Sequence, residues 1–146
     1  MNELPGNPDD REVRSLLQRV RRIAVVGLSP KPHRDSHRVS AYMKRNGYEV
    51  VPVYPREEAI LGAKVYRSVA EVEGAVDLVN VFRRFDELDQ VAADILRSKD
   101  AGSAAVWFQL DCVHDGAIRE LAKAGHLVVY DRCLMVEHSR LLSPPD

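Results

Sequence analysis

Arg22-Ile-Ala-Val-Val-Gly27 is a short apolar run near the start of the chain, rich in β-branched residues and closed by glycine. A run of this kind, without alternating polar residues, is typical of a strand buried on both faces of a parallel sheet. The residues before it predict a helix. Asp9 and Glu12 have the spacing of a capping box, and they are followed at helical spacing by Val13, Leu16, Leu17 and Val20.

After Gly27, strand and helix patterns alternate to the end of the chain. The apolar runs predict further strands over 48–53, 77–82, 104–108 and 127–130. The 3.6-residue periodicity predicts helices over 36–46, 86–99 and 114–124, and a short helical tail that carries Leu134 and Leu141. The segment 57–74 is less regular, with one turn of helix near 69–72.

Five strands that alternate with helices predict an α/β fold, a Rossmann-like doubly wound parallel five-stranded sheet in a single domain. Right-handed crossovers favour a strand order such as 3-2-1-4-5. Residues 1–8 are polar and hold two prolines, so we expect a flexible tail there and a folded domain over 9–146.

Composition narrows the classes of function. The chain of 146 residues has a net charge of -1, from 21 Lys and Arg against 22 Asp and Glu, and this argues against a general nucleic-acid binder. Its two cysteines, Cys112 and Cys133, form no C-x-x-C pair and suit free thiols in a reducing compartment. We find neither a signal-peptide pattern nor a long apolar run, and we therefore expect a cytoplasmic protein without a membrane partner.

Cationic residues follow the predicted strands. In such sheets ligands bind beyond the carboxyl ends of the strands, and a rim of positive charge there would attract an anion. Backbone N–H groups near Gly27 and Ser36 would add donors for a phosphate. The alternative is that these are solvated loop charges paired with nearby acids. The expected rim consists of Lys31, Arg34, Arg38, Arg56, Arg83, Arg84 and Arg132, with His33 and His37 beside them.

Two local patterns bear on the type of nucleotide. Only the first glycine of the dinucleotide fingerprint G-x-G-x-x-G is present, because Gly27 is followed by Leu-Ser-Pro-Lys-Pro. After the second strand, where NAD binding usually requires an acidic residue, the chain has Tyr54, Pro55 and Arg56. Arginine suits a phosphate on the ribose, which points to NADP or to the 3′-phosphate of coenzyme A.

Five short motifs, taken in order, resemble a known family. They are Gly27-Leu-Ser-Pro30, Val53-Tyr-Pro-Arg56, Val81-Phe-Arg-Arg84, Val106-Trp-Phe-Gln109 and Asp131-Arg-Cys-Leu-Met-Val-Glu-His138. With these motifs the chain is similar to the small stand-alone CoA-binding domain proteins, which are related to the CoA-binding domain of the succinyl-CoA synthetase alpha subunit. The resemblance covers about residues 10 to 142 and implies the same Rossmann-like fold.

The resemblance also implies a binding site. The CoA phosphates would be held by Gly27, Leu28, Ser29 and Pro30, and the adenosine end would be bordered by Pro55 and Arg56. The nucleotide groove would be lined by Val81, Phe82, Arg83 and Arg84, with Trp107 to Gln109 near the pantetheine. Lys31, Arg34 and Tyr54 complete the candidate cofactor site. One position departs from the family, because Asp111 stands where relatives often have glycine, and an acid there would repel a phosphate.

We predict no catalytic or metal-ligating residue. The five histidines form no triad with Ser or Cys at informative spacing, and no set of side chains has metal-ligand spacing. One interpretation of Asp131-Arg132-Cys133 with Glu137-His138 is a reactive site, in which Arg132 lowers the pKa of Cys133 so that the thiol can act as a nucleophile. The alternative is structural, with Cys133 a packed side chain and with Glu137 and His138 positioning the C-terminal helix.

The sequence therefore predicts a non-catalytic protein that binds coenzyme A or an acyl-CoA. It could act as a carrier, a sensor or a partner subunit. The alternatives are an NADP-dependent oxidoreductase, a subunit of an acyl-CoA-processing enzyme, and an interaction protein whose basic rim is a docking face. The expected partner is a small nucleotide cofactor, and both a homodimer and a partner enzyme subunit stay open.

Overall fold

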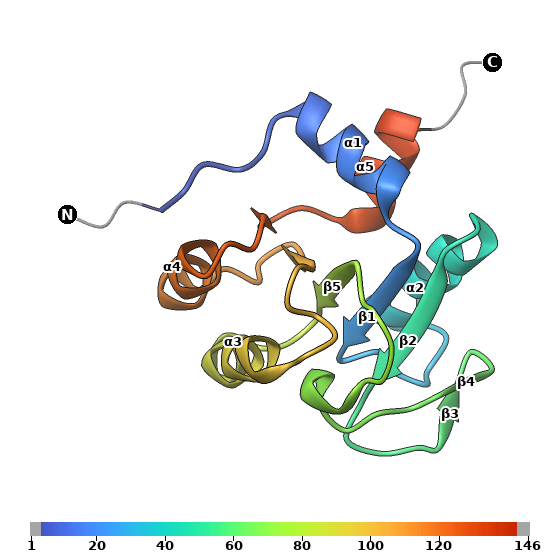
Figure 1. Cartoon of the computed structure of the whole chain (residues 1–146). Helices are drawn as coiled ribbons and strands as arrows, with labels where there is room; N and C mark the ends of the chain where they lie inside the picture. The colour runs from blue at the N-terminus through green and yellow to red at the C-terminus, as the bar shows by residue number, and fades with distance from the viewer. Residues whose placement is uncertain (1–3, 143–146) are drawn as a thin grey trace.

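The computed structural model describes residues 4–142. It contains a five-stranded parallel sheet covered by helices on both faces (Figure 1), which confirms the predicted fold class. The strands of this sheet are β1 (Arg22–Val26), β2 (Glu49–Val53), β5 (Leu78–Val81), β6 (Ala105–Phe108) and β7 (Val128–Val129). The helices are α1 (Asp10–Arg19), α2 (Asp35–Arg45), α3 (Leu88–Arg97), α4 (Asp115–Lys123) and α5 (Leu134–Leu142).

The two faces of the sheet bury separate hydrophobic clusters. Side chains of α1, α2 and α5 pack on one face together with Trp107 and Leu28, both of which are fully buried. Side chains of α3 and α4 pack on the other face, around Phe108 and Val81. Because both faces are covered, each central strand is apolar along nearly its whole length, as the sequence runs predicted.

The order of the strands differs from the prediction. The sheet runs β2-β1-β5-β6-β7, which is 2-1-3-4-5 when its five strands are counted along the chain, so the predicted 3-2-1-4-5 is wrong. The reason lies in Pro52, which has no N–H group and is tolerated only where a strand forms the edge of a sheet. On that outer edge the Pro52 carbonyl accepts a hydrogen bond from the Tyr66 N–H at 3.0 Å. β2 therefore ends the sheet, and the next strand pairs with the other side of β1.

The irregular segment after β2 contains a small hairpin that the sequence did not reveal. Its strands are β3 (Ala59–Ile60) and β4 (Ala63–Lys64), paired antiparallel. The two turn residues, Leu61 and Gly62, both have positive φ angles of 52° and 77°. Leucine is an uncommon residue in that conformation, so the usual hairpin signal is missing. The predicted helical turn is present as the 3-10 helix η1 (Val69–Glu71).

Helix α3 begins slightly later than predicted. A 3-10 turn, η2 (Phe85–Glu87), precedes it and connects it to β5. Arg84 is the N-cap residue of this turn, and Glu87 is the N-cap residue of α3.

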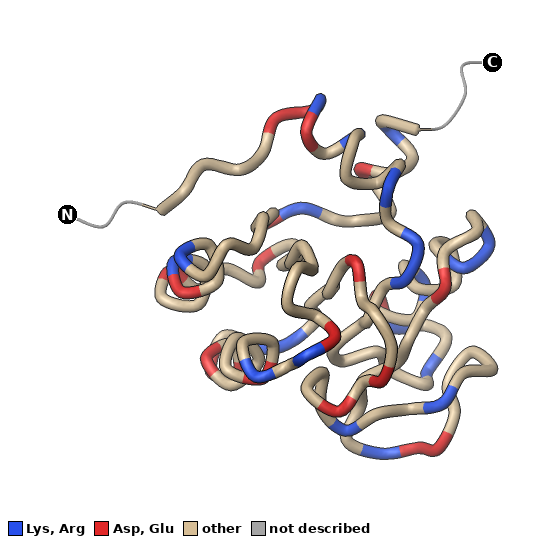
Figure 2. Tube along the Cα trace, viewed as in Figure 1, with Lys and Arg blue, Asp and Glu red and all other residues tan. Residues whose placement is uncertain are grey.

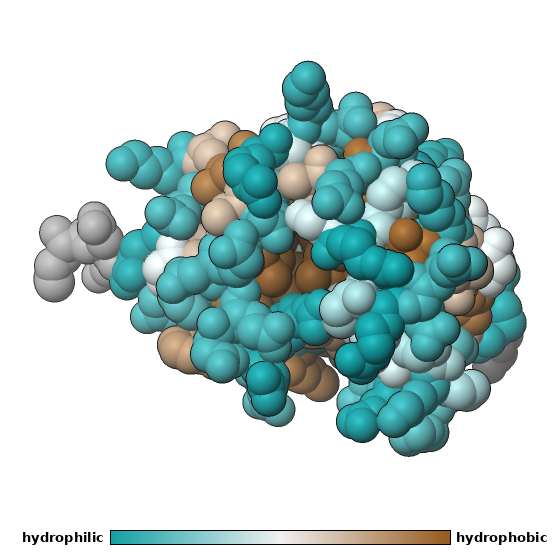
Figure 3. All heavy atoms as spheres, turned by 90° about the horizontal axis from the view of Figure 1, so that it is seen from below, coloured by the Kyte–Doolittle hydropathy of each residue, from teal (hydrophilic) through white to brown (hydrophobic). Residues whose placement is uncertain are grey.

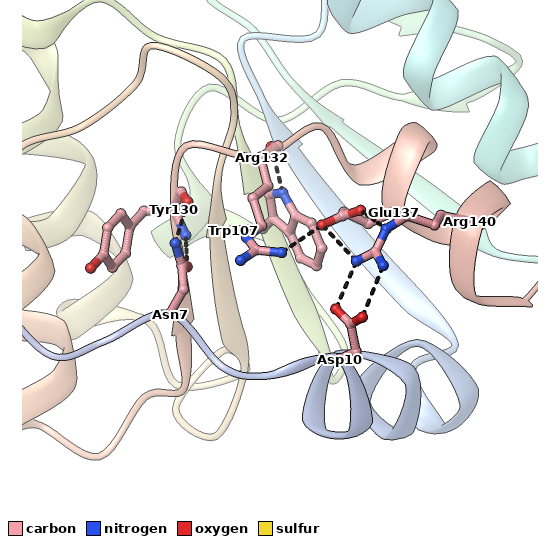
Figure 4. Close-up of polar contacts among 7 residues, drawn as sticks. All are labelled: Asn7, Asp10, Trp107, Tyr130, Arg132, Glu137 and Arg140. Atoms are coloured by element: carbon pink, nitrogen blue, oxygen red, sulfur yellow. Dashed lines mark hydrogen bonds and ion pairs between the residues drawn. The ribbon is translucent and has the colours of Figure 1, made fainter.

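Part of the segment expected to be a tail lies against the edge strand β7. The Asn7 side chain donates to the Tyr130 carbonyl and accepts from the Tyr130 N–H, both at 2.9 Å (Figure 4). The Tyr130 hydroxyl donates to the Pro5 carbonyl at 2.8 Å. Residues 1–3 and 143–146 lie outside the described residues. Among the helices described over 4–142, none has both the length and the apolar composition needed to cross a lipid bilayer.

Candidate functional site: a groove at the carboxyl ends of the strands

The order of the strands fixes where a ligand can bind. The chain leaves β1 toward α2 on one face of the sheet, and it leaves the neighbouring β5 toward α3 on the other face. The two connections therefore diverge and open a crevice between the ends of β1 and β5, which is the usual binding place in doubly wound folds. Gly27 and Phe82 are the first residues after these two strands.

Gly27 allows these two chain segments to approach closely. Its φ angle is 87°, and a Cβ atom built on it would lie 2.1 Å from the Phe82 carbonyl oxygen. Its N–H donates to the Val53 carbonyl at 2.8 Å, and the Phe82 N–H donates to the Val26 carbonyl at 2.8 Å. Any other residue at position 27 would have to displace one of these backbone segments.

The loop after Gly27 is fixed onto the start of α2. The Ser29 N–H donates to the Ser36 Oγ at 3.0 Å, and the Lys31 N–H donates to the Ser29 Oγ at 3.1 Å. The ring Nδ1 of His37 lies 2.9 Å from the Ser29 carbonyl. Arg34 is the N-cap of α2 and makes no side-chain capping bond. The positive end of the helix dipole is therefore presented at this loop without a side-chain oxygen at its N-cap.

Two adjoining cavities form one groove at this end of the molecule. The first, here called the cationic arm, has a volume of about 420 Å³. The second arm has about 650 Å³ and shares Arg34, Tyr54 and Phe82 with the first. These volumes are typical of small-molecule sites. Figure 3 views the molecule from this end and shows a hollow near the centre, with hydrophobic atoms at its floor and hydrophilic atoms around it.

The cationic arm carries more positive than negative charge. Its lining includes Lys31, Arg34 and Arg56 and a single acid, Asp35. Asp35 is already paired with Arg38, a neighbour on α2 that does not line the arm. The Arg56 guanidinium lies 5.7 Å from the centre of the Tyr54 ring, which is half-buried in the groove. An anion in this arm would meet three cations and the start of a helix.

The second arm has balanced charge in the part beyond Arg34, which it shares with the cationic arm. There Arg83 and Arg84 line it together with the acids Glu87 and Asp111. The Glu87 carboxylate contacts both arginines, with Oε2 at 3.7 Å from Arg83 and Oε1 at 3.4 Å from Arg84. Figure 2 shows the mixture of basic and acidic segments in the loops at the lower end of the sheet. The apolar part of the lining comes from Phe82 and the exposed Leu110.

Cys112 lies in the wall of the second arm, where it is almost fully buried. Its Sγ donates a hydrogen bond to the Arg83 carbonyl at 3.0 Å. Burial raises the pKa of the Cys112 thiol, and the hydrogen bond to the Arg83 backbone opposes this only in part. The thiol is therefore protonated at neutral pH, which makes it a poor nucleophile.

Most of the residues predicted to bind a cofactor lie around this groove. Leu28 and Val81 are fully buried, so only their main-chain atoms could reach a ligand. Pro30 and Pro55 are absent from the lining of either arm. The predicted residues that do line the groove are Gly27, Ser29, Lys31, Arg34, Tyr54, Arg56, Phe82, Arg83, Arg84 and Gln109.

Two arginines expected on the same rim lie elsewhere. Arg38 contacts Asp35 and donates to the His33 carbonyl at 3.1 Å. Arg132 is held by Glu137 at 2.7 Å. Neither lines the groove, and neither do His33 and His37. For these two arginines the alternative of paired loop charges is the better description.

Arg67 is a residue of this site that the sequence did not reveal. One of its guanidinium nitrogens, Nη1, donates to the carbonyls of Tyr54, Arg56 and Glu57 at 3.2, 2.8 and 2.8 Å. Glu57 has a φ of 71°, so the chain turns sharply where Arg67 holds it. A lone arginine in an irregular segment carries no recognisable pattern. Only the structure connects it to the loop that carries Tyr54 and Arg56.

The acidic and basic residues near the C-terminus form a structural cluster (Figure 4). The Glu137 carboxylate accepts from Arg132 at 2.7 Å and from Arg140 at 2.8 Å, and Arg140 also contacts both oxygens of Asp10. The hydrogen bond from Arg140 holds the pKa of Glu137 and that of Asp10 below their usual range. These contacts join α5 to α1, as the structural interpretation of Glu137 predicts.

His138 belongs to the same helix. Its Nδ1 lies 2.8 Å from the Tyr42 hydroxyl, so this contact ties α5 to α2. Burial lowers the pKa of the imidazole, which therefore stays neutral at pH 7. Within the described part of the chain, no group of three or more His, Cys, Asp or Glu side chains is arranged to hold a metal ion.

Comparison with known proteins places these observations in a family. A family model described as the CoA binding domain matches residues 21–139. An uncharacterized protein of Bacillus subtilis, YneT, is 41% identical over 133 residues, which is 91% of this chain and 96% of that protein. A solved structure of a hypothetical protein from Pyrococcus horikoshii has a TM-score of 0.88 and 34% identity, and the match covers 98% of this chain and 100% of that one.

A shorter match concerns a protein whose activity is named. The alpha subunit of an ADP-forming acetate–CoA ligase II from Pyrococcus furiosus is 44% identical over 59 residues. This match covers 40% of the present chain and 13% of the ligase subunit. The likeness is therefore to a small part of that subunit.

Proposed function

The chain belongs to the CoA-binding domain family, and from that premise we propose that it binds coenzyme A, free or acylated, in the groove beside Gly27. The observation that carries the proposal is the cationic arm. Lys31, Arg34 and Arg56, from two separate loops, surround one cavity at the start of α2. Coenzyme A carries a pyrophosphate and a 3′-phosphate, so it offers the multiple negative charge that such a cavity attracts.

The chemistry of the cationic arm suits phosphate groups. The guanidinium groups of Arg34 and Arg56 can each donate two hydrogen bonds to phosphate oxygens, and the Lys31 ammonium adds a point charge. The N–H groups of Gly27, Ser29 and Lys31 are bonded within the protein, so the other main-chain N–H groups of this loop, such as that of Leu28, would add neutral donors. Arg56 follows β2, where a ribose phosphate is bound in related nucleotide folds. In this proposal Pro55 borders the adenosine beside Arg56 and Tyr54.

The second arm suits the rest of the coenzyme A molecule. Pantetheine is a long uncharged chain with two amide groups and a terminal thiol. Phe82 and Leu110 supply apolar surface for it. The Gln109 side chain lines the arm, and its Oε1 accepts from the Leu134 N–H at 3.0 Å, which fixes the amide at the start of α5. A ligand with phosphates at one end and a neutral chain at the other would therefore match both arms.

We propose binding and not catalysis as the role of this domain. Cys112, the thiol in the groove wall, is buried and protonated at neutral pH. The cluster of Glu137 and His138 serves the attachment of α5. A carrier, a sensor or a subunit that presents the cofactor to another protein would each fit a domain of this kind.

A thermal-shift assay with CoA, acetyl-CoA, NAD, NADP and ATP tests the proposal. A ligand at 100 times its dissociation constant stabilises the folded state by about 2.7 kcal/mol. We expect CoA and acetyl-CoA to raise the melting temperature and NAD to leave it unchanged. Stabilisation by NADP alone would favour an oxidoreductase, and no response to any ligand would leave the groove as a docking face. Either result contradicts the proposal.

A further inference from the structure

The two arms of the groove differ in charge in a way that bears on the acyl group. The cationic arm has three cations against one acid, and that acid is occupied by Arg38. In the second arm, Arg83 and Arg84 face two acids in the lining, Glu87 and Asp111. The Asp86 carboxylate adds a third, at 3.8 Å from Arg84. Beyond Arg34, which both arms share, the second arm therefore offers no net positive charge to a ligand.

Glu87 is the residue that produces this balance. It is the N-cap of α3, but its side chain makes no capping hydrogen bond. Instead its two carboxylate oxygens contact the two arginines, one each. A single carboxylate thus lies between Arg83 and Arg84, in the arrangement that a carboxylate or phosphate of a ligand would otherwise adopt. Without Glu87 the two arginines would form a second anion site.

We infer that Glu87 makes the second arm selective for acyl groups without a negative charge. The inference rests on the proposed function, because it assumes that CoA phosphates occupy the cationic arm. The thiol end of the cofactor, with any acyl group on it, then lies in the second arm. A carboxylate at the end of that acyl group would meet the acids Glu87 and Asp111, while Arg83 and Arg84 are already paired with Glu87. Neutral acyl groups would meet no such repulsion.

Propionyl-CoA and malonyl-CoA test the inference, since both acyl groups have three carbons and only malonyl ends in a carboxylate. We expect calorimetric titration of the whole chain to give weaker binding of malonyl-CoA, by about 3- to 10-fold. A difference of this size is expected from the screened repulsion between the malonyl carboxylate and a carboxylate of the protein a few ångströms away. In Glu87→Gln the ratio of the two dissociation constants should fall to about one or reverse, because Arg83 loses its carboxylate partner and Arg84 keeps only Asp86, so both can bind the acyl carboxylate.

Two features keep the experiment decisive. The ratio compares two ligands on the same protein, so a partly unfolded variant does not change it. Glu120→Gln makes the same substitution on the exposed side of α4, outside both arms, and should leave the ratio as in the unaltered protein. Equal binding of both ligands by the unaltered protein, or an unchanged ratio in Glu87→Gln, overturns the inference alone. Failure of both ligands and of free CoA to bind overturns the proposed function and the inference with it.

Discussion

At the level of one residue, Gly27 allows the loop after β1 to approach Phe82, the residue after β5. We expect Gly27→Ala to lower the free energy of unfolding by about 2–4 kcal/mol, measured by urea denaturation. The positive φ angle is unfavourable for alanine, and the new Cβ would lie 2.1 Å from the Phe82 carbonyl oxygen, so backbone atoms must move.

Gly125→Ala is the matched control for this substitution. Gly125 has a φ of 100°, but a Cβ atom there would meet nothing within 4 Å. Gly125→Ala should therefore lower the free energy of unfolding only by the cost of placing alanine at a positive φ angle, about 1 kcal/mol. If the two variants lose the same stability, the close approach of Gly27 to Phe82 is not what position 27 requires.

Arg56 tests the cationic arm. We expect Arg56→Ala to weaken CoA binding by about 1–3 kcal/mol, through the loss of charged hydrogen bonds. The affinity for dephospho-CoA, which lacks the 3′-phosphate, should change less. Arg45→Ala, at the far end of α2, removes the same charge outside the groove and serves as the control. An Arg56→Ala variant that binds CoA as tightly as the Arg45→Ala variant would remove Arg56 from the site.

At the level of elements, the loop between β2 and the small hairpin depends on Arg67. We expect Arg67→Ala to weaken CoA binding by about 1–2 kcal/mol although the side chain lines neither arm, because the loop carrying Tyr54 and Arg56 loses three hydrogen bonds. Arg67→Lys should recover part of the affinity.

A double-mutant cycle distinguishes positioning from general damage to the fold. If Arg67 acts through the loop that places Arg56, Arg67→Ala should cost clearly less affinity in the Arg56→Ala background than in the unaltered protein. Fully additive losses would mean that the two residues act independently.

The attachment of α5 to α1 predicts a dependence of stability on pH. The pKa of Glu137 is lowered from its ordinary value of 4.5, so the unfolded state binds a proton more readily than the folded state. The stability from this group is therefore fully present above about pH 5 and is lost as the pH falls through the lower, folded-state pKa. We expect the free energy of unfolding to decline across this acidic range, less steeply in Glu137→Gln.

The same variant also has an expected effect at neutral pH. Glu137→Gln should lower the free energy of unfolding by about 1–2 kcal/mol at pH 7, since Arg132 and Arg140 lose a shared carboxylate. Burial lowers the pKa of His138, which adds its own loss of stability in acid, and comparison with the variant separates the two groups. Equal acid dependence in both proteins would exclude Glu137 as a source.

For the whole molecule, the sequence predicted the elements better than their arrangement. The apolar runs identified all five strands of the main sheet, because strands buried on both faces leave a continuous hydrophobic pattern. Their order was wrong, although Pro52 held the information: a proline within a strand indicates an edge. The hairpin at Leu61 and Gly62 was missed because leucine seldom occupies the left-handed turn conformation.

The site was predictable to a similar degree. Residues that directly follow strands, such as Arg56 and Arg83, could be assigned to one end of the sheet from the sequence. The sequence could not predict which charged residues are already paired with an internal acid, because pairing depends on side-chain geometry. Arg132 and Arg38 are bound to internal acids, and Arg67 reaches the loop from a segment without a regular pattern.

Amide chemical-shift mapping of the isotope-labelled protein during titration with CoA tests the central claim most directly. The account predicts saturable shifts concentrated in the loop from Gly27 to Ser36, at Tyr54 and Arg56, and from Phe82 to Arg84. The amides of α1, and those of α5 beyond Leu134, whose N–H is bonded to Gln109 in the groove, should stay unchanged. Shifts centred on the cluster of Asp10 and Glu137, or none at CoA concentrations far above those in a cell, would contradict the assignment of a CoA site to the groove.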